Sequence, residues 1–220
     1  MNKAHAQEIT GGITQTSKMP CKSYSLPTIA CKTGFLMSEI AGSICASCYA
    51  QKGFYAVYAG KIEPAQHARL TSIECAIENA EYRQAWIAAM QTLIGNDQYF
   101  RFHDSGDIQS IEHLELYAEL ARSMPYCQFW IPTREYGIVA AFSAQFDLPD
   151  NIIIRLSAMF VNKPVVVPAS LRNVPGIAAS NVHTENAIGT ACNAPKQSGK
   201  CLDCRACWDR TIFSISYKSH

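Results

Sequence analysis

Eight of the ten cysteines in this 220-residue chain fall into two groups of four, one near each end of the chain. The first group is Cys21, Cys31, Cys45 and Cys48, and the second is Cys192, Cys201, Cys204 and Cys207. A Cys-x-x-Cys turn lets two thiolates meet one metal, and four thiolates complete either a tetrahedral zinc site or one four-iron cluster. The sequence therefore predicts a metalloprotein with two metal centres.

Length and composition predict one globular domain in the cytoplasm. A chain of 220 residues can bury one sizeable core, and its 48% apolar and 17% charged content excludes the disordered class. No apolar run approaches the ~20 residues that span a bilayer, and residues 1–10 lack the apolar core of a signal peptide. In the cytoplasm thiols stay reduced, so paired cysteines indicate metal ligands before disulfides. The net charge of +1 does not predict binding to nucleic acid or to a membrane surface. It is compatible with a local basic patch that binds nucleic acid.

Strand and helix patterns alternate along the middle of the chain. We expect strands at 98–103, 127–132, 151–157 and 164–168, helices at 64–94, 110–123 and 134–145, and a last strand in T-I-F-S-I-S-Y. Such alternation is typical of parallel strands joined by right-handed crossovers. We divide the chain into an extended lead-in (1–30), an α/β core (31–180) and a cysteine-rich C-terminal segment (181–220).

Polar residues follow three consecutive predicted strands, where parallel α/β folds place their ligand sites. His103 and Asp104 follow the first strand, and Arg134 follows the second. These three are the candidates for catalytic groups. The alternative for Asp104 and Asp107 is that their carboxylates satisfy turn and helix-start amides, and for Arg134 it is a surface ion pair with Glu135.

Five stretches together resemble a phage protein family. They are S-I-C-A-S-C-Y-A (43–50), R-F-H-D-S-G-D (101–107), F-W-I-P-T-R (129–134), N-I-I-I-R-L-S (151–157) and C-L-D-C-R-A-C-W (201–208). The set resembles the phage "gene product 88" family, and the order of motifs is remotely similar to the radical S-adenosylmethionine (SAM) superfamily. That resemblance implies a partial (β/α) barrel of mostly parallel strands with a cysteine-rich C-terminal extension. It also implies a [4Fe–4S] cluster held by three cysteines, with one iron open for SAM.

The superfamily resemblance also implies which residues contact SAM. Tyr49 matches the aromatic residue near the adenine. The turn Ser105, Gly106 and Asp107 resembles the one that receives the SAM amino group, and Arg155 and Ser157 occupy a strand end that contacts the carboxylate or ribose.

The first cysteine group departs from the superfamily spacing. Cys45 and Cys48 match its last two cysteines, but the first would fall at position 41, which is Ala41. Either Cys31 or Cys21 would have to replace it across a longer loop. If only one of them binds, the cluster keeps an open iron for SAM. If both bind, cysteines take all four ligand positions and the site is closed. Structural zinc sites are closed in the same way, whereas catalytic zinc sites keep one position open.

The second group matches the Cys-x2-Cys-x2-Cys run of ferredoxin-type clusters, with Cys192 as a remote fourth ligand. Four ligands predict a closed auxiliary cluster, so the chain would carry two [4Fe–4S] clusters. A four-cysteine zinc site is the alternative that spacing alone leaves open.

Three functions compete. The first is a radical SAM-like enzyme that needs an electron donor and acts on an unidentified small-molecule or macromolecular substrate. The second is a non-catalytic metalloprotein with closed iron–sulfur or zinc sites, serving a phage in the host cytoplasm as a redox, scaffold or nucleic-acid-associated module. The third, ranked last, is a zinc hydrolase or nuclease that uses His103, Asp104 and Asp107. The sequence does not indicate the oligomeric state.

Overall fold

The computed structural model describes residues 1–219, with Phe54 described by its backbone alone; His220, the last residue of the predicted C-terminal segment, lies outside the described residues. Within 1–219, eight strands form one sheet in the order β1-β2-β3-β4-β5-β6-β8-β7. The strands are β1 (Thr14–Gln15), β2 (Lys22–Tyr24), β3 (Tyr99–Phe102), β4 (Gln128–Thr133), β5 (Ile152–Ser157), β6 (Ile177–His183), β7 (Thr190–Ala191) and β8 (Ser214–Lys218). Only β1 pairs antiparallel among these strands, which confirms the predicted mixed α/β class with a mostly parallel sheet.

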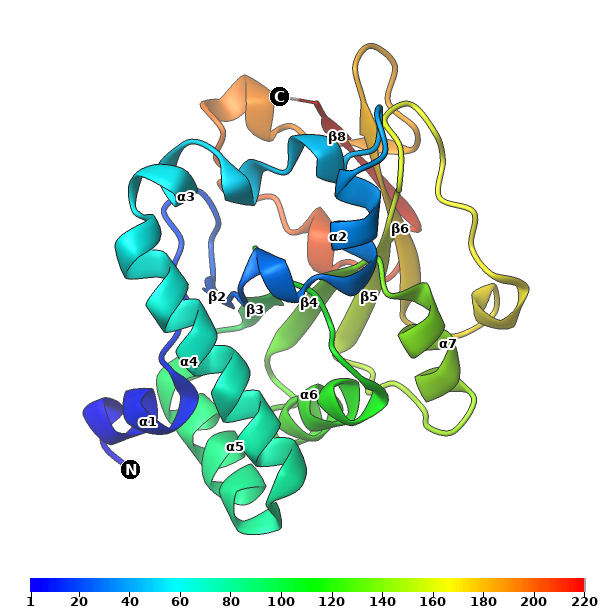
Figure 1. Cartoon of the computed structure of the whole chain (residues 1–220). Coiled ribbons are helices and arrows are strands. Elements are labelled where there is room, and N and C mark those ends of the chain that lie inside the picture. Colours follow the sequence, from blue (N-terminus) through cyan, green and yellow to red (C-terminus); the bar gives the residue numbers. More distant parts are fainter. Residues whose placement is uncertain (220) are drawn as a thin grey trace.

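Helices cover one face of this sheet (Figure 1). The helices are α1 (Lys3–Thr10), α2 (Lys32–Ser38), α3 (Phe54–Val57), α4 (Ala59–Glu78), α5 (Ala80–Ile94), α6 (Ile111–Ser123) and α7 (Tyr136–Ser143). Apolar side chains of α4 to α7 pack with alternate strand residues such as Phe100, Phe129 and Ile152 in one buried core. Because side chains alternate along a strand, the intervening residues face the other side of the sheet.

The second face of the sheet is covered by the C-terminal segment. Arg101, Trp130 and Ile153 are neighbours across β3, β4 and β5 on this face. Trp208 packs edge-on against Trp130, with ring centroids 5.4 Å apart, and its indole N–H donates to the carbonyl of Phe100 at 2.9 Å. The segment that carries Cys207 is therefore anchored against this second face of the sheet.

Arg155 fixes that segment. The side chain is fully buried on β5, and a buried guanidinium needs partners for its charge and for all its donors. Its five N–H groups donate to backbone carbonyls, four of them in the C-terminal segment: Cys207 (2.9 Å), Ala206 (3.0 Å), Asp209 (3.0 Å), Ile212 (3.0 Å) and Ala179 on β6 (3.4 Å).

Several sequence predictions need correction. The lead-in is not wholly extended, because α1 forms there, with the Asn2 side chain accepting from the backbone N–H of His5. The predicted helix at 64–94 is two helices that separate at Asn79, and Pro64 lies inside α4, not at its start. The segment 164–168 is not a strand, because its two prolines cannot donate to a ladder. The short β2 and the long β6 were not predicted.

None of the helices among the described residues is both long and apolar enough to cross a membrane.

Candidate metal and cofactor site at the carboxyl ends of the strands

Three cysteines lie near one another beside the ends of β4 and β5. Cys31 immediately precedes α2, and Cys45 lies in a short 3₁₀ turn, Cys45–Ser47. A Cβ atom placed on Gly34 of α2 would lie 3.7 Å from the sulfur of each, so the two sulfurs are at most twice that distance apart. Cys48 closes the 3₁₀ turn through its backbone N–H to the Cys45 carbonyl at 3.1 Å. Burial raises the pKa of Cys31 and Cys45, and the nearby Cys48 thiol adds to that rise.

Cys21 is not part of this group. It precedes β2, at the opposite end of that strand from Cys31, and packs with Trp130, Ile153 and Trp208 on the second face of the sheet. Burial raises the pKa of its thiol to about 12, and the cysteine that acts on it electrostatically is Cys201. The sequence left Cys21 and Cys31 as alternatives, and the structure places Cys31 with the Cys45–Cys48 pair.

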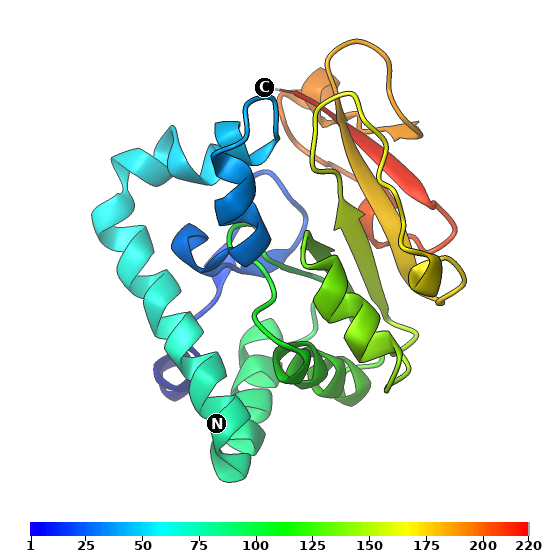
Figure 2. The ribbon, with the colours of Figure 1, turned by 45° about the vertical axis from the view of Figure 1, so that its right-hand side comes forward.

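The loop that carries these three cysteines is clamped onto the sheet. The buried carboxylate of Glu135 accepts from both the backbone N–H and the hydroxyl of Thr33 at 2.8 Å. The backbone N–H of Ile44 donates to the carbonyl of Met159, just after β5, at 2.9 Å. Figure 2 shows α2 (blue) standing beside the upper tip of β5 (olive), as these contacts require.

The turn after β3 packs against Leu26, which precedes the cysteine loop. Gly106 has φ +79°, and a Cβ there would lie 2.4 Å from the Cβ of Leu26 and 2.8 Å from its carbonyl oxygen. Only glycine combines this backbone conformation with such a close approach. The Ser105 hydroxyl donates to the Leu26 carbonyl at 2.9 Å and accepts from Gln66 at 2.7 Å.

Asp107 joins the turn to the end of β4. Its carboxylate accepts from the Thr133 hydroxyl (2.6 Å) and from the backbone N–H groups of Arg134 (2.9 Å) and Ile108 (2.8 Å). Burial raises its pKa to about 6, although these three donors oppose the shift. The alternative predicted for Asp107, satisfaction of backbone amides, is therefore present in the structure.

Arg134 places a positive charge beside the thiols. Its Nε donates to the Ala158 carbonyl at 3.1 Å, which fixes the side chain at the end of β5. Burial raises the pKa of Cys31 and Cys45, and the Arg134 guanidinium partly offsets that rise. No ion pair joins Arg134 to Glu135 among the described residues, because Glu135 is engaged with Thr33.

Asp104 and Tyr49 connect the turn to the cysteine loop. The Tyr49 hydroxyl donates to the Asp104 carbonyl, and Tyr55 donates to Asp104 Oδ2 at 2.9 Å. The other carboxylate oxygen of Asp104 is buried and has no hydrogen-bond partner among the described residues.

The ring of His103 packs against α6. Its backbone has φ 55°, and its ring lies 5.7 Å from that of His113 and 5.6 Å from that of Tyr117. Burial holds its pKa well below the usual value, so the ring is neutral. The structure therefore does not bring His103 together with Asp104 and Arg134.

The two residues predicted at the end of β5 have protein partners. All five N–H groups of Arg155 are engaged by carbonyls, which leaves none for a ligand in this conformation. The Ser157 hydroxyl accepts from Ser180 at 3.3 Å, and its carbonyl accepts from the Tyr136 hydroxyl at 2.7 Å.

The second cysteine group surrounds a small cavity on the other face of the sheet. The cavity has a volume of about 30 Å³ and is lined by Cys192, Cys201, Cys204 and Cys207, with Trp208 and Ile215 among the other walls. Cys75 and Cys127 do not line it.

The donor chemistry at both places suits soft metals, because all ten cysteines are free thiols. As the side chains stand, no three His, Cys, Asp or Glu residues in the described part of the chain converge closely enough to hold a metal ion. Binding of a metal group at either place therefore requires the cysteine side chains to come closer together.

Sequence reasoning missed Thr33 and Tyr136, which contact the ends of the strands. Thr33 lies close to Cys31 in the sequence and Tyr136 follows Thr133, and these positions are the only signal that the sequence gives for them.

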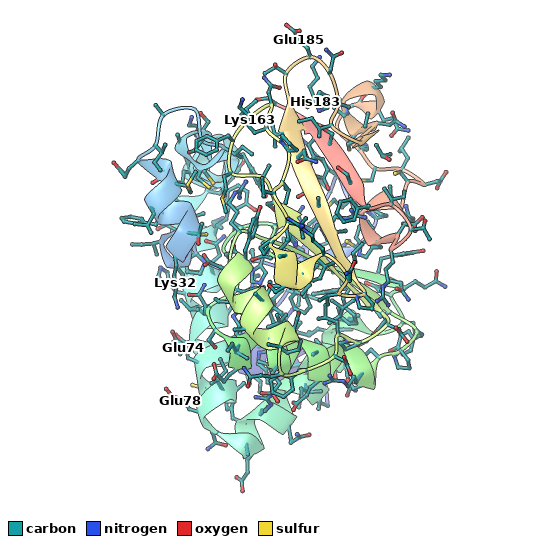
Figure 3. The ribbon with its side chains drawn as sticks, turned by 90° about the vertical axis from the view of Figure 1, so that its right-hand side faces the viewer. Lys32, Glu74, Glu78, Lys163, His183 and Glu185 are labelled. Carbon is teal, nitrogen blue, oxygen red and sulfur yellow. The ribbon has the colours of Figure 1, made fainter. Side chains whose placement is uncertain are left out.

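His183, on β6, is buried and contacts Ser216 at 2.6 Å. Figure 3 shows His183 high on the molecule with Lys163 and Glu185, far from Lys32 at the start of α2.

Comparison with known proteins gives one match. Neither the curated proteins nor the solved structures contain a significant match to this sequence. The model of one family, Gene product 88, matches residues 1–210. The chain therefore belongs to the phage Gene product 88 family.

Proposed function

We propose that this protein is an iron–sulfur protein that binds SAM at a [4Fe–4S] cluster held by Cys31, Cys45 and Cys48. One observation carries the proposal: three thiols, and not four, gather at the carboxyl ends of parallel strands. Cys21, the remaining member of the first cysteine group, lies on the second face of the sheet. A three-thiolate site leaves one coordination position open, as catalytic metal sites do.

The residues around these thiols have distinct roles in the proposed site. The Arg134 guanidinium offsets the negative charge that thiolates and cluster bring to a buried place. The unpartnered Asp104 Oδ1 is an acceptor suited to the amino group of SAM. Thr33 and Glu135 hold α2, and with it Cys31, against β4. When bound and reduced, the cluster supplies the electron for cleavage of the SAM sulfonium bond, and the cofactor carries that chemistry.

Paired serine substitutions test this assignment. Cys31→Ser and Cys21→Ser would be loaded anaerobically with iron and sulfide, reduced, and examined by electron paramagnetic resonance (EPR) with and without SAM. We expect SAM to change the spectrum of the wild type and of Cys21→Ser. Cys31→Ser should lose that change together with about four iron per chain. A wild type whose spectrum ignores SAM, or a Cys31→Ser variant that keeps the change, would refute the proposal.

A non-catalytic metalloprotein is the second candidate, and one observation favours it. Ser105, Asp107 and Arg155, three of the residues predicted to contact SAM, already have their hydrogen bonds within the protein. In that case both centres carry electrons or hold the fold together. Calorimetry would then detect no SAM binding to protein that has its full metal content.

A further inference from the structure

A hydroxyl group lies against one sulfur of the C-terminal cysteine group. The Tyr217 oxygen on β8 is 3.2 Å from Cys207 Sγ. A phenol keeps its proton at neutral pH, so the Tyr217 hydroxyl becomes the donor once Cys207 is a thiolate.

A positive charge faces the same group from the sheet. Arg101 projects from β3 and lies over the Trp130 ring, 4.5 Å from its centroid. Burial raises the pKa of Cys21, Cys201 and Cys207, and the Arg101 charge partly offsets that rise. Its Nε is buried without a hydrogen-bond partner among the described residues.

One wall of this cysteine group is apolar and buried, whereas Cys204 is exposed. The cavity between them holds about 30 Å³, and Trp208 and Ile215, which wall it, are almost wholly buried. In such a place a nearby charge or a hydrogen bond to sulfur acts more strongly than in water. Four thiolates make the site anionic, and a cation and a hydroxyl donor stabilise further negative charge there.

We propose that Cys192, Cys201, Cys204 and Cys207 bind a redox-active [4Fe–4S] cluster whose reduction potential is raised by the Tyr217 hydroxyl and the Arg101 guanidinium. The assignment concerns a different site from the proposed SAM site and does not depend on it. One electron from a one-electron donor, such as dithionite, enters the cluster. The four thiolates stay bound, no protein bond forms or breaks, and the site becomes more negative by one elementary charge. Hydrogen bonds to the sulfurs and local charge are among the factors that set the potential of such clusters.

The test removes the other thiol group first. A background variant carrying Cys31→Ala, Cys45→Ala and Cys48→Ala lacks the proposed SAM site, so the C-terminal cluster is the one that is measured. The result then does not depend on whether the protein binds SAM. We expect it to retain about four iron per chain. In this background Tyr217→Phe and Arg101→Met are compared by dithionite titration monitored by EPR. Tyr126→Phe and Arg122→Met are matched controls on the exposed surface.

Tyr217→Phe should raise the oxidised-to-reduced ratio at a fixed potential about tenfold, which is about 59 mV for a one-electron couple. Arg101→Met should shift the ratio in the same direction, and both controls should leave it unchanged. Zinc in place of iron in the background variant would overturn the proposal. So would an unchanged potential in Tyr217→Phe, which removes one oxygen atom and keeps the ring. Loss of iron from Cys21→Ala, with retention in Cys192→Ala, would overturn the ligand set.

Discussion

Replacing Arg155 by methionine should strongly destabilise the protein. Methionine keeps much of the apolar stem and removes the guanidinium with all five hydrogen bonds to backbone carbonyls. Four of those carbonyls belong to the C-terminal segment. The substitution therefore detaches the cysteine-rich segment from β5, as well as deleting a charge.

The expected loss is about 3 to 5 kcal/mol in the free energy of unfolding. A hydrogen bond to a charged group contributes about 1.5 to 3 kcal/mol, and a buried carbonyl left unpaired costs about 1 to 3 kcal/mol. Five such bonds do not add, because the loosened segment lets water reach some carbonyls. Breaking a buried charged network typically costs about 3 to 5 kcal/mol. That is a large share of the ~5–15 kcal/mol by which domains are stable.

Urea unfolding, followed by tryptophan fluorescence, measures this loss. Trp208 belongs to the segment that Arg155 holds and packs against Trp130 of β4, so the pair reports on detachment of that segment. Arg155→Lys should recover little, because an ammonium lacks the planar five-donor fork. Arg172→Met, on the exposed surface, is the matched control and should change stability by less than about 0.5 kcal/mol. A loss below about 1 kcal/mol in Arg155→Met would refute the reasoning.

Three further predictions concern the proposed SAM site. Gly106→Ala should lower stability by about 2 to 4 kcal/mol in urea unfolding, because its Cβ would collide with Leu26 at a positive φ; an unchanged midpoint would contradict this. Asp107 has a folded pKa of about 6, above its ordinary 3.8, so its contribution to stability is present below pH ~4 and lost as pH rises through 6. In metal-free protein the stability of the wild type relative to Asp107→Asn should therefore fall by about 3 kcal/mol over that range, and a rise would contradict the assignment. Glu135→Ala frees Thr33, so protease cleavage within 32–48 should become faster, and equal cleavage rates would show that the clamp is unimportant.

The long elements of the fold could be predicted from the sequence. The apolar run Ile152–Ile154 and the alternation around Phe100 and Phe129 indicated three central strands, and the structure has β3, β4 and β5 there. β2 could not be predicted, because three residues are too few to show alternation. That short strand separates Cys21 from Cys31, so cysteine spacing alone could not tell which of them lies near the Cys45–Cys48 pair.

The role of Arg155 shows a second limit of sequence reasoning. Arg155 stands between Ile154 and Leu156 and was expected to contact SAM, but the structure buries it completely among protein partners. Its partners are carbonyls more than 20 residues away in the chain, most of them in the cysteine-rich segment. Backbone carbonyls carry no sequence signal, so the partner could not be identified before the fold was known.

The most direct test of the central claim is the content of iron, acid-labile sulfide and zinc in protein expressed and purified without oxygen. Two four-iron clusters predict about eight iron and eight sulfide per chain, with no zinc. Loss of about half of both from Cys31→Ser, but not from Cys21→Ser, would locate one cluster at the ends of the strands. About two zinc per chain and no sulfide would contradict the account and leave a zinc protein held together at two closed sites.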